Sequence, residues 1–285
     1  MSIRKYKLYN YVLKTDIEFD MLREISFQEE LGQELFLFVN QPKFEEPEYI
    51  LHFEEDIVYY FFSKKNAIFV ETSDINNLYS SFFNIPMSIY ALLKNSVLIH
   101  CNGLIFNGSL FCFSGNKGLG KTTLALHMMK YGQLFSDDCI AFAIENDNVL
   151  GYNASQIIKT CEDTFNIIYK NENYSDYYDT FSKKAHKKFD LVPNNSIEVK
   201  KIFFLNRSIK NNFEVKEINS EIIKKMLITQ SIVGTDYFHK ELLEGFKNSK
   251  ILQLIIDNVR FFELYIPCLT KYKDECENLY QIIVP

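Results

Sequence analysis

Apolar residues in the first 80 positions come in short runs separated by polar or charged breaks. Such runs, rich in β-branched and aromatic residues, are typical of β-strands, and their close succession predicts an antiparallel meander. We interpret residues 1–80 as a small β-rich accessory or substrate-binding region. The expected strands are Lys7–Leu13, Glu34–Asn40, Tyr49–Phe53, Ile57–Phe62 and Ala67–Glu71.

The pattern changes near residue 80, where apolar residues begin to recur at helical spacing as far as Lys94. Two strand-like runs come next, Val97–Phe106 and Ser109–Ser114, joined by Asn107-Gly108, a pair that favours a two-residue hairpin turn. We therefore expect a second domain over residues 81–285.

Helix-like and strand-like patterns alternate through the rest of the chain, which predicts an α/β domain. Residues 171–188 are polar and rich in Tyr and Lys, and we expect a mobile loop there. Helices are expected at Lys121–Lys130, Ile218–Ile228 and Phe238–Asp257, and strands at Cys139–Ile144, Lys200–Asn206 and Val259–Ile266.

A glycine-rich motif lies between the strand-like run that ends at Ser114 and the helical pattern that starts at Lys121. It fills every fixed position of G-x-x-x-x-G-K-[ST], in which backbone N–H groups surround phosphate oxygens, a lysine neutralises them and a hydroxyl binds Mg²⁺. The motif predicts a site for ATP and Mg²⁺. The candidate nucleotide-binding residues are Gly115, Asn116, Lys117, Gly118, Leu119, Gly120, Lys121, Thr122 and Thr123.

Two adjacent carboxylates, Asp137 and Asp138, come just before the next expected strand. Near a phosphate site, one carboxylate can face Mg²⁺ while the other accepts the proton of a hydroxyl that attacks phosphorus. The alternative is an ordinary solvated turn. His100 lies within an apolar run, where a lone histidine is usually a core residue, but it could instead face the site, beside Asp137.

Composition narrows the choice of partners. The 285 residues include 37 acidic and 31 basic side chains, a net charge of −6, which offers no general attraction to nucleic acid or to an anionic membrane. No apolar stretch is long enough for a membrane span, and the first ten residues lack a signal core, so we expect a cytoplasmic protein. The six cysteines form no CxxC pair and are expected to be reduced and structural.

Several of these motifs together resemble the C-terminal catalytic domain of HPr kinase/phosphorylase, which shares a phosphate-binding core with ATP-type phosphoenolpyruvate carboxykinase. The resemblance covers about residues 97–145: a histidine, a hairpin, the phosphate loop, a helix and a paired Asp-Asp, in that order. It implies an α/β fold with a P-loop kinase core, a mixed β-sheet, and a homo-oligomer.

The resemblance also implies roles for single residues. By analogy, Asp137 is the base, Asp138 lies on the metal side with Thr122, and His100 and Lys121 complete the catalytic group. Smaller relatives carry a basic pair after a variable loop, which here corresponds to Lys187 and Lys188; either could clamp phosphates or be a solvated surface charge.

The resulting hypothesis is a kinase that transfers the γ-phosphoryl group of ATP to a hydroxyl, above all to serine of a peptide or protein, as in peptide maturation. A small-molecule hydroxyl acceptor is an alternative. A regulatory or scaffold subunit that binds nucleotide without transfer is another, although it would be free to lose the Asp pair. An assembly ATPase ranks last, because only Leu134-Phe135 precedes the Asp pair as an apolar run.

Overall fold

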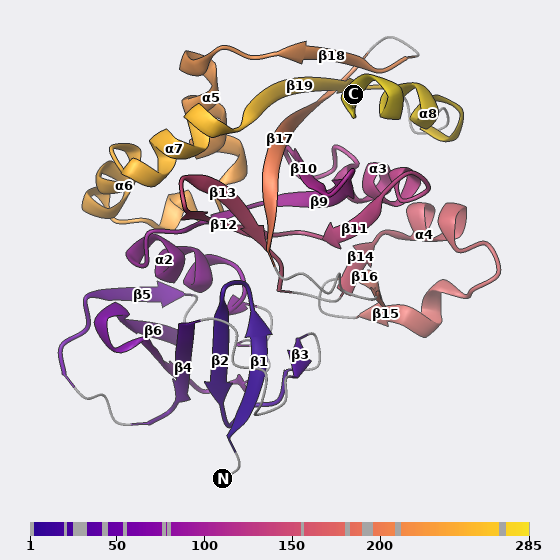
Figure 1. Cartoon of the computed structure of the whole chain (residues 1–285). Coiled ribbons are helices and arrows are strands. Elements are labelled where there is room, and N and C mark those ends of the chain that lie inside the picture. Colours follow the sequence, from indigo (N-terminus) through magenta and orange to yellow (C-terminus); the bar gives the residue numbers. More distant parts are fainter. Residues whose placement is uncertain are drawn as a thin grey trace.

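The computed structural model of the chain describes residues 3–19, 22–24, 33–41, 45–53, 56–75, 78, 81–154, 157–179, 183–189, 196–208, 212–267 and 272–284. Within these residues the chain is a mixed α/β protein with three β-sheets (Figure 1). The expected domain boundary at residue 80 and one of the six cysteines, Cys268, lie outside the described residues.

The first sheet curls around the N-terminal region, with strand order β3-β1-β2-β4-β7-β6-β5 (Figure 1). The predicted antiparallel meander is wrong at two places, because β4 enters between β2 and β7 and runs parallel to both. The expected first strand is also broken, since Tyr9 has a positive φ of 54° and turns the chain back. The strands are β1 Arg4–Leu8, β2 Tyr11–Thr15, β3 Arg23–Glu24, β4 Gln33–Val39, β5 Tyr49–Phe53, β6 Ile57–Phe62 and β7 Ala67–Thr72.

The second sheet is mixed and is built around one long strand, β17. It pairs in parallel with β10 on one side and β19 on the other, and its first residues pair antiparallel with β13. The strands are β8 Val97–Ile99, β9 Cys101–Phe106, β10 Ser109–Ser114, β11 Gln133–Ser136, β12 Ile140–Glu145, β13 Asn148–Tyr152, β17 Ser196–Arg207, β18 Glu214–Glu217 and β19 Arg260–Ile266.

Helices cover both faces of the second sheet, as the alternation of side chains along a strand requires. Ile202 and Phe204 of β17 belong to one buried cluster, whereas Phe203 and Leu205 belong to the other. Residues of α5, α6 and α7 join the first cluster and residues of α3 and α8 the second. The helices are α2 Ile85–Leu93, α3 Lys121–Met128, α4 Glu162–Ile168, α5 Ser220–Met226, α6 Lys240–Lys247, α7 Lys250–Asn258 and α8 Tyr272–Ile283.

A third, small sheet replaces the loop expected at residues 171–188. Its strands are β14 Ile157–Thr160, β15 Tyr178–Asp179 and β16 Lys184–Lys188, with β16 between the other two. The sequence pattern missed it because its strands are short and the central one, β16, is lysine-rich, so no apolar alternation marks them. The long helix expected over Phe238–Asp257 is likewise divided, because Ser249 caps a new helix by accepting the Leu252 N–H.

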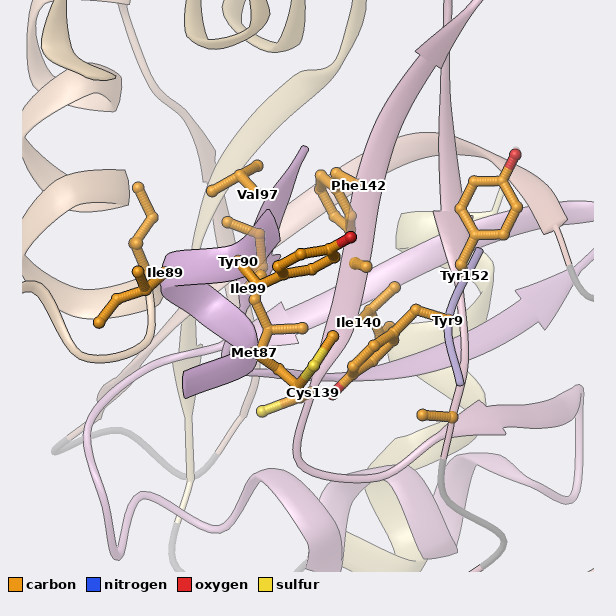
Figure 2. Packing of buried hydrophobic residues seen from close by; sticks show 14 of the residues in the cluster. Tyr9, Met87, Ile89, Tyr90, Val97, Ile99, Cys139, Ile140, Phe142 and Tyr152 are labelled. Atoms are coloured by element: carbon orange, nitrogen blue, oxygen red, sulfur yellow. The ribbon is translucent and has the colours of Figure 1, made fainter. Parts of the chain in front are cut away.

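Helix α2 and the β1–β2 turn lie between the first sheet and the second and connect the two (Figure 1). In Figure 2, the Tyr9 ring lies beside Cys139 and Ile140 of the second sheet, with Met87 of α2 close by. The Tyr9 N–H donates to the carbonyl of Asn153 at 3.1 Å. One continuous buried cluster therefore supports both the N-terminal sheet and the strand that comes after the Asp pair.

Among the described residues, no helix is both long and apolar enough to cross a membrane.

Candidate functional site

The glycine-rich loop, residues 115–120, leaves the carboxyl end of β10 and enters α3 at Lys121, as the motif predicts. Gly115, Gly118 and Gly120 all have positive φ, at 149°, 85° and 91°. Gly115 is also closely packed, since a Cβ there would lie 3.1 Å from Leu119 Cδ1 and 3.2 Å from the Leu205 carbonyl oxygen. Glycine is therefore required for this path of the backbone.

The hairpin that feeds the loop is confirmed as well. Asn107 and Gly108 have φ values of 50° and 76°, and β9 and β10 pair antiparallel on either side of them. This hairpin fixes β10 in the middle of the second sheet, so that the glycine-rich loop starts from a rigid, buried strand.

Lys121 lies over the loop from the first turn of α3. Its Nζ donates to the carbonyl of Gly115 at 2.8 Å and to that of Asn116 at 3.4 Å, and only 9% of the residue is exposed. Burial lowers the pKa of this lysine. An ammonium held inside the loop by the loop's own carbonyls is placed to meet an anion that enters there.

The Asp pair lies where two antiparallel segments cross from one half of the second sheet to the other. Because Gly103 pairs with Ser136 and Ile99 with Ile140, residues 100–102 lie opposite residues 137–139. Both segments break at this point, so His100 lies between β8 and β9 rather than within the single strand expected from the sequence. The shared break is what brings the histidine to the Asp pair.

Asp137 is buried beside the start of α3 and is saturated with donors. Its Oδ1 accepts from the Thr122 hydroxyl at 3.0 Å and from the Asn102 side-chain amide, and its Oδ2 accepts from the Lys159 backbone N–H at 2.8 Å. Its exposed fraction is 3%. The Thr122 hydroxyl and the Asp137 carboxylate together form an oxygen-donor pair of the kind that Mg²⁺ prefers.

Asp138 is centred in a tight turn, with φ of 78° and the Cys139 N–H donating to the Asp137 carbonyl at 3.1 Å. Its carboxylate meets two basic residues: Oδ1 is 3.3 Å from His100 Nε2 and Oδ2 is 3.0 Å from Lys159 Nζ. The sequence suggested that His100 would lie beside Asp137, but its partner is Asp138.

The two carboxyl groups are shifted in opposite directions. Burial and the neighbouring charge of Asp138 raise the pKa of Asp137, although the Lys159 N–H and the Thr122 hydroxyl oppose this. Burial would also raise the pKa of Asp138, but the His100 hydrogen bond and the Lys159 charge outweigh it and hold that pKa well below its usual range. Asp138 is therefore a firmly ionised acceptor.

Lys159 of β14 is a site residue that the sequence reasoning missed. Through its N–H and its Nζ it contacts both carboxylates, and Asp138 raises its pKa against the effect of burial. Its direct neighbour on β16 is His186, and side chains of directly paired residues lie on one face of a sheet. Nothing in a four-residue strand with one lysine distinguishes this residue in the sequence.

Lys187, one of the two lysines that could have been a phosphate clamp or a solvated surface charge, is not brought to the Asp pair. It pairs with Ile158 rather than with Lys159, and its Nζ forms an ion pair with Glu172 and lies over the Tyr169 ring, 4.1 Å from the centroid. Lys188 is exposed at the end of β16. The small sheet thus directs Lys159, and not Lys187, toward Asp138.

Two further residues could have been found from the sequence. Asn102 is a lone amide in an apolar run, and Arg207 is a charged residue at the end of an apolar run expected as a strand. Arg207 Nη2 donates to the Gly118 carbonyl at 3.0 Å, because β17 is parallel to β10 and the two carboxyl ends lie side by side. Charged side chains at this edge of a parallel sheet commonly reach a ligand.

Together, the fold and the site define a mixed α/β protein whose glycine-rich strand-to-helix loop carries a lysine and a threonine beside two carboxylates. No protein-family model and no curated protein matches the chain. Among solved structures, it is similar to the Hpr(Ser) kinase/phosphatase from Coxiella burnetii, with 18% identity and a TM-score of 0.27 over 42% of this chain and 72% of that chain. A similarity this low carries no argument about function, which rests on the contacts described above.

Proposed function

We propose that the chain is an ATP- and Mg²⁺-dependent kinase that transfers the γ-phosphoryl group to a hydroxyl, with serine of a peptide or protein as the favoured acceptor. The observation that carries the proposal is the direct hydrogen bond from Thr122 to Asp137, next to a glycine-rich loop with Lys121 folded over it. A threonine hydroxyl and an aspartate beside a glycine-rich loop are the groups that hold Mg²⁺ in nucleotide sites, which supports the proposal.

The residues present fit such a ligand. Backbone N–H groups of residues 116–123, at the start of α3, would face the phosphates, and Lys121 would exchange its loop carbonyls for phosphate oxygens. ATP would supply the phosphoryl group, and Mg²⁺ would offset the charge on its phosphate oxygens. Arg207, already bonded to Gly118, adds a second cation at the mouth of the loop.

We assign Asp137 to the metal side and Asp138 to the acceptor hydroxyl, the reverse of the assignment made by analogy from the sequence. Asp137 is bonded to Thr122 and is too deeply buried to meet an acceptor. Asp138 is more open, with 36% of its side chain exposed, and is held in one orientation by His100 and Lys159.

Asp138 would act chiefly by orienting the hydroxyl. Its pKa is held low, so it is a weak base before transfer, but an ionised oxygen fixed in place can accept a hydrogen bond from the attacking hydroxyl. In a loose transition state the hydroxyl proton becomes acidic late, when little basicity is needed. His100 and Lys159 would keep Asp138 ionised and aimed throughout.

The rival proposals share the nucleotide site and differ in the fate of the phosphoryl group. A scaffold subunit would bind ATP and transfer nothing, and a small-molecule kinase would use a metabolite in place of a peptide. The contacts of Asp138 with His100 and Lys159 favour a catalytic role over a scaffold, because mere nucleotide binding does not need a carboxylate held in this way. We also propose that residues 1–80 contribute to the acceptor side, since the Tyr9 turn packs against Cys139.

The test is transfer from γ-labelled ATP and Mg²⁺ to serine, threonine and tyrosine peptides and to small hydroxyl metabolites. Asp138→Asn should slow transfer by about 10²- to 10⁴-fold while nucleotide binding persists, and Lys121→Ala should abolish both. Asp147→Asn is a matched control, because Asp147 is also an aspartate at positive φ but lies in the exposed β12–β13 turn. Tight ATP binding without any labelled acceptor would leave the scaffold proposal in its place.

A further inference from the structure

One face of the small third sheet carries a row of basic residues next to the Asp pair. His186 of β16 is paired in register with Lys159 of β14, so the two side chains lie on the same face. Lys184 and Lys188, two positions before and after His186, lie on that face too, because side chains alternate along a strand. We call Lys184, His186 and Lys188 the basic row.

The opposite face of this sheet is the one that packs on the protein. Ile158 of β14 is buried in the same cluster as residues of α3, and Ala185 of β16 is fully buried. Lys187, which also lies on this face, is occupied by Glu172 and by the Tyr169 ring. The basic row is therefore on the face that is turned away from α3 and α4.

The basic row passes the Asp pair on its way outward from the glycine-rich loop. Its middle is level with Lys159, whose Nζ is 3.0 Å from Asp138 Oδ2. Its first residue, Lys184, is on the side of the loop, since its charge adds to the effect of burial in lowering the pKa of Lys121. Lys188 is at the other end and is exposed. It therefore lies beyond Asp138, on the side away from the nucleotide phosphates.

The two lysines of the row carry charge that no carboxylate offsets. In the part of the chain that the structure describes, neither Lys184 nor Lys188 forms an ion pair. His186 is 3.8 Å from Asp179, and burial lowers its pKa although Asp179 opposes this, so it adds little charge at neutral pH. In a chain whose net charge is −6, the row thus presents two unpaired cations beside Asp138.

We propose that the basic row selects an acceptor peptide that carries an acidic residue close to the phosphorylated hydroxyl, an inference that rests on the proposed kinase function. With the hydroxyl at Asp138, level with His186, an extended peptide along β16 has the residue two positions away beside Lys188. The spacings match because alternate side chains of any extended chain repeat at about 6.6 Å. Lys184 lies toward the nucleotide phosphates, which compete for its charge, so Lys188 is the specificity-determining residue.

The test compares serine peptides that differ in one side chain. Peptides of glycine and alanine with one central serine carry glutamate, glutamine or lysine two positions before or two positions after the serine. Their affinity for the full chain is measured by fluorescence anisotropy with Mg²⁺ and a non-hydrolysable ATP analogue, and their KM and kcat by transfer from γ-labelled ATP.

On one side of the serine, the glutamate peptide should bind about two- to fivefold more tightly than the glutamine peptide, which is the effect of one exposed ion pair. The difference should appear in KM and not in kcat, because Lys188 lies away from the transferred group. It should also shrink as the salt concentration rises, since salt screens an exposed pair.

Two neighbouring lysines provide a matched comparison. Lys188→Gln should abolish the preference for glutamate, whereas Lys187→Gln, which removes the same charge from the opposite face of the same strand, should retain it. Lys188→Glu should bind the lysine peptide more tightly than the wild type does, a gain that misfolding does not produce.

Equal affinity for the glutamate and glutamine peptides, including no detectable binding of either, would overturn the proposal, as would a preference that survives Lys188→Gln. Transfer to serine in such a case would leave the kinase function in place. A preference for glutamate that depends on Lys188, without any transfer, would support the basic row as a surface for an acidic peptide and count against the kinase function.

Discussion

The two carboxylates should respond differently to the same substitution. Asp137→Asn replaces a carboxylate that accepts hydrogen bonds on both oxygens by an amide that has only one oxygen. Turned one way, its NH₂ group faces the Lys159 N–H; turned the other way, it faces the Asn102 side-chain NH₂, with only the Thr122 hydroxyl able to rotate and accept. A buried donor without an acceptor costs about 1–3 kcal/mol, so the melting temperature should fall by about 2–5 °C.

Asp138→Asn should be milder. Asparagine tolerates a positive φ nearly as well as aspartate does. The ion pairs lost with His100 and Lys159 involve a side chain that is 36% exposed, where such pairs contribute about 0–1 kcal/mol. We therefore expect a change of at most a few degrees in melting temperature, and Asp147→Asn, in its exposed turn, provides the baseline for an unrelated aspartate.

Nucleotide binding separates the two roles without knowledge of the acceptor. A non-hydrolysable ATP analogue at about 100 times its Kd stabilises a protein by about 2.7 kcal/mol. The part of this stabilisation that depends on Mg²⁺ should disappear in Asp137→Asn and persist in Asp138→Asn, as followed by thermal melts with and without Mg²⁺. The opposite result would refute the placement of Asp137 on the metal side and restore the assignment made by analogy from the sequence.

Individual contacts lead to three further predictions. Lys159→Met should slow phosphoryl transfer in single-turnover assays by about 10²- to 10³-fold, the loss typical of one preorganised charge. Lys187→Met is the control: Lys187 lies on the same small sheet but forms an ion pair with Glu172, so its loss should change the rate less than twofold. Equal losses in the two variants would contradict the orientation of that sheet. Gly115→Ala should destabilise the fold by about 1–3 kcal/mol and abolish nucleotide binding, because its Cβ would approach Leu119 and the Leu205 carbonyl. Denaturant melts measure the loss of stability, and titration with a non-hydrolysable ATP analogue measures the loss of binding. Unaltered binding would contradict the loop geometry. Cys161 is exposed, whereas burial raises the pKa of Cys276 to about 12, so a thiol reagent should label the former quickly and the latter only on unfolding, as peptide mapping would reveal.

Local sequence determined the parts of the site that lie close together in the chain. The glycine-rich loop, its flanking strand and helix, and the Asn107-Gly108 hairpin all depend on backbone preferences and spacing within about twenty residues, and the structure has each of them where it was expected. Strand and helix patterns likewise located most of the second sheet, because alternating burial leaves a period that can be read from the residues themselves.

Only the tertiary structure decided which segments of the chain lie opposite one another. Three features depend on how distant segments pair: the parallel direction of β4, the carboxylate that His100 meets, and the lysine of the small sheet that points to Asp138. For the histidine and the lysine, a shift of one residue in register would turn the side chain to the other face of the sheet. Lys159 and Lys187 are indistinguishable as residues. Strand pairing alone places Lys159 beside both carboxylates and Lys187 over the Tyr169 ring. The direction of a side chain in a sheet is set by partner strands that the local sequence does not contain.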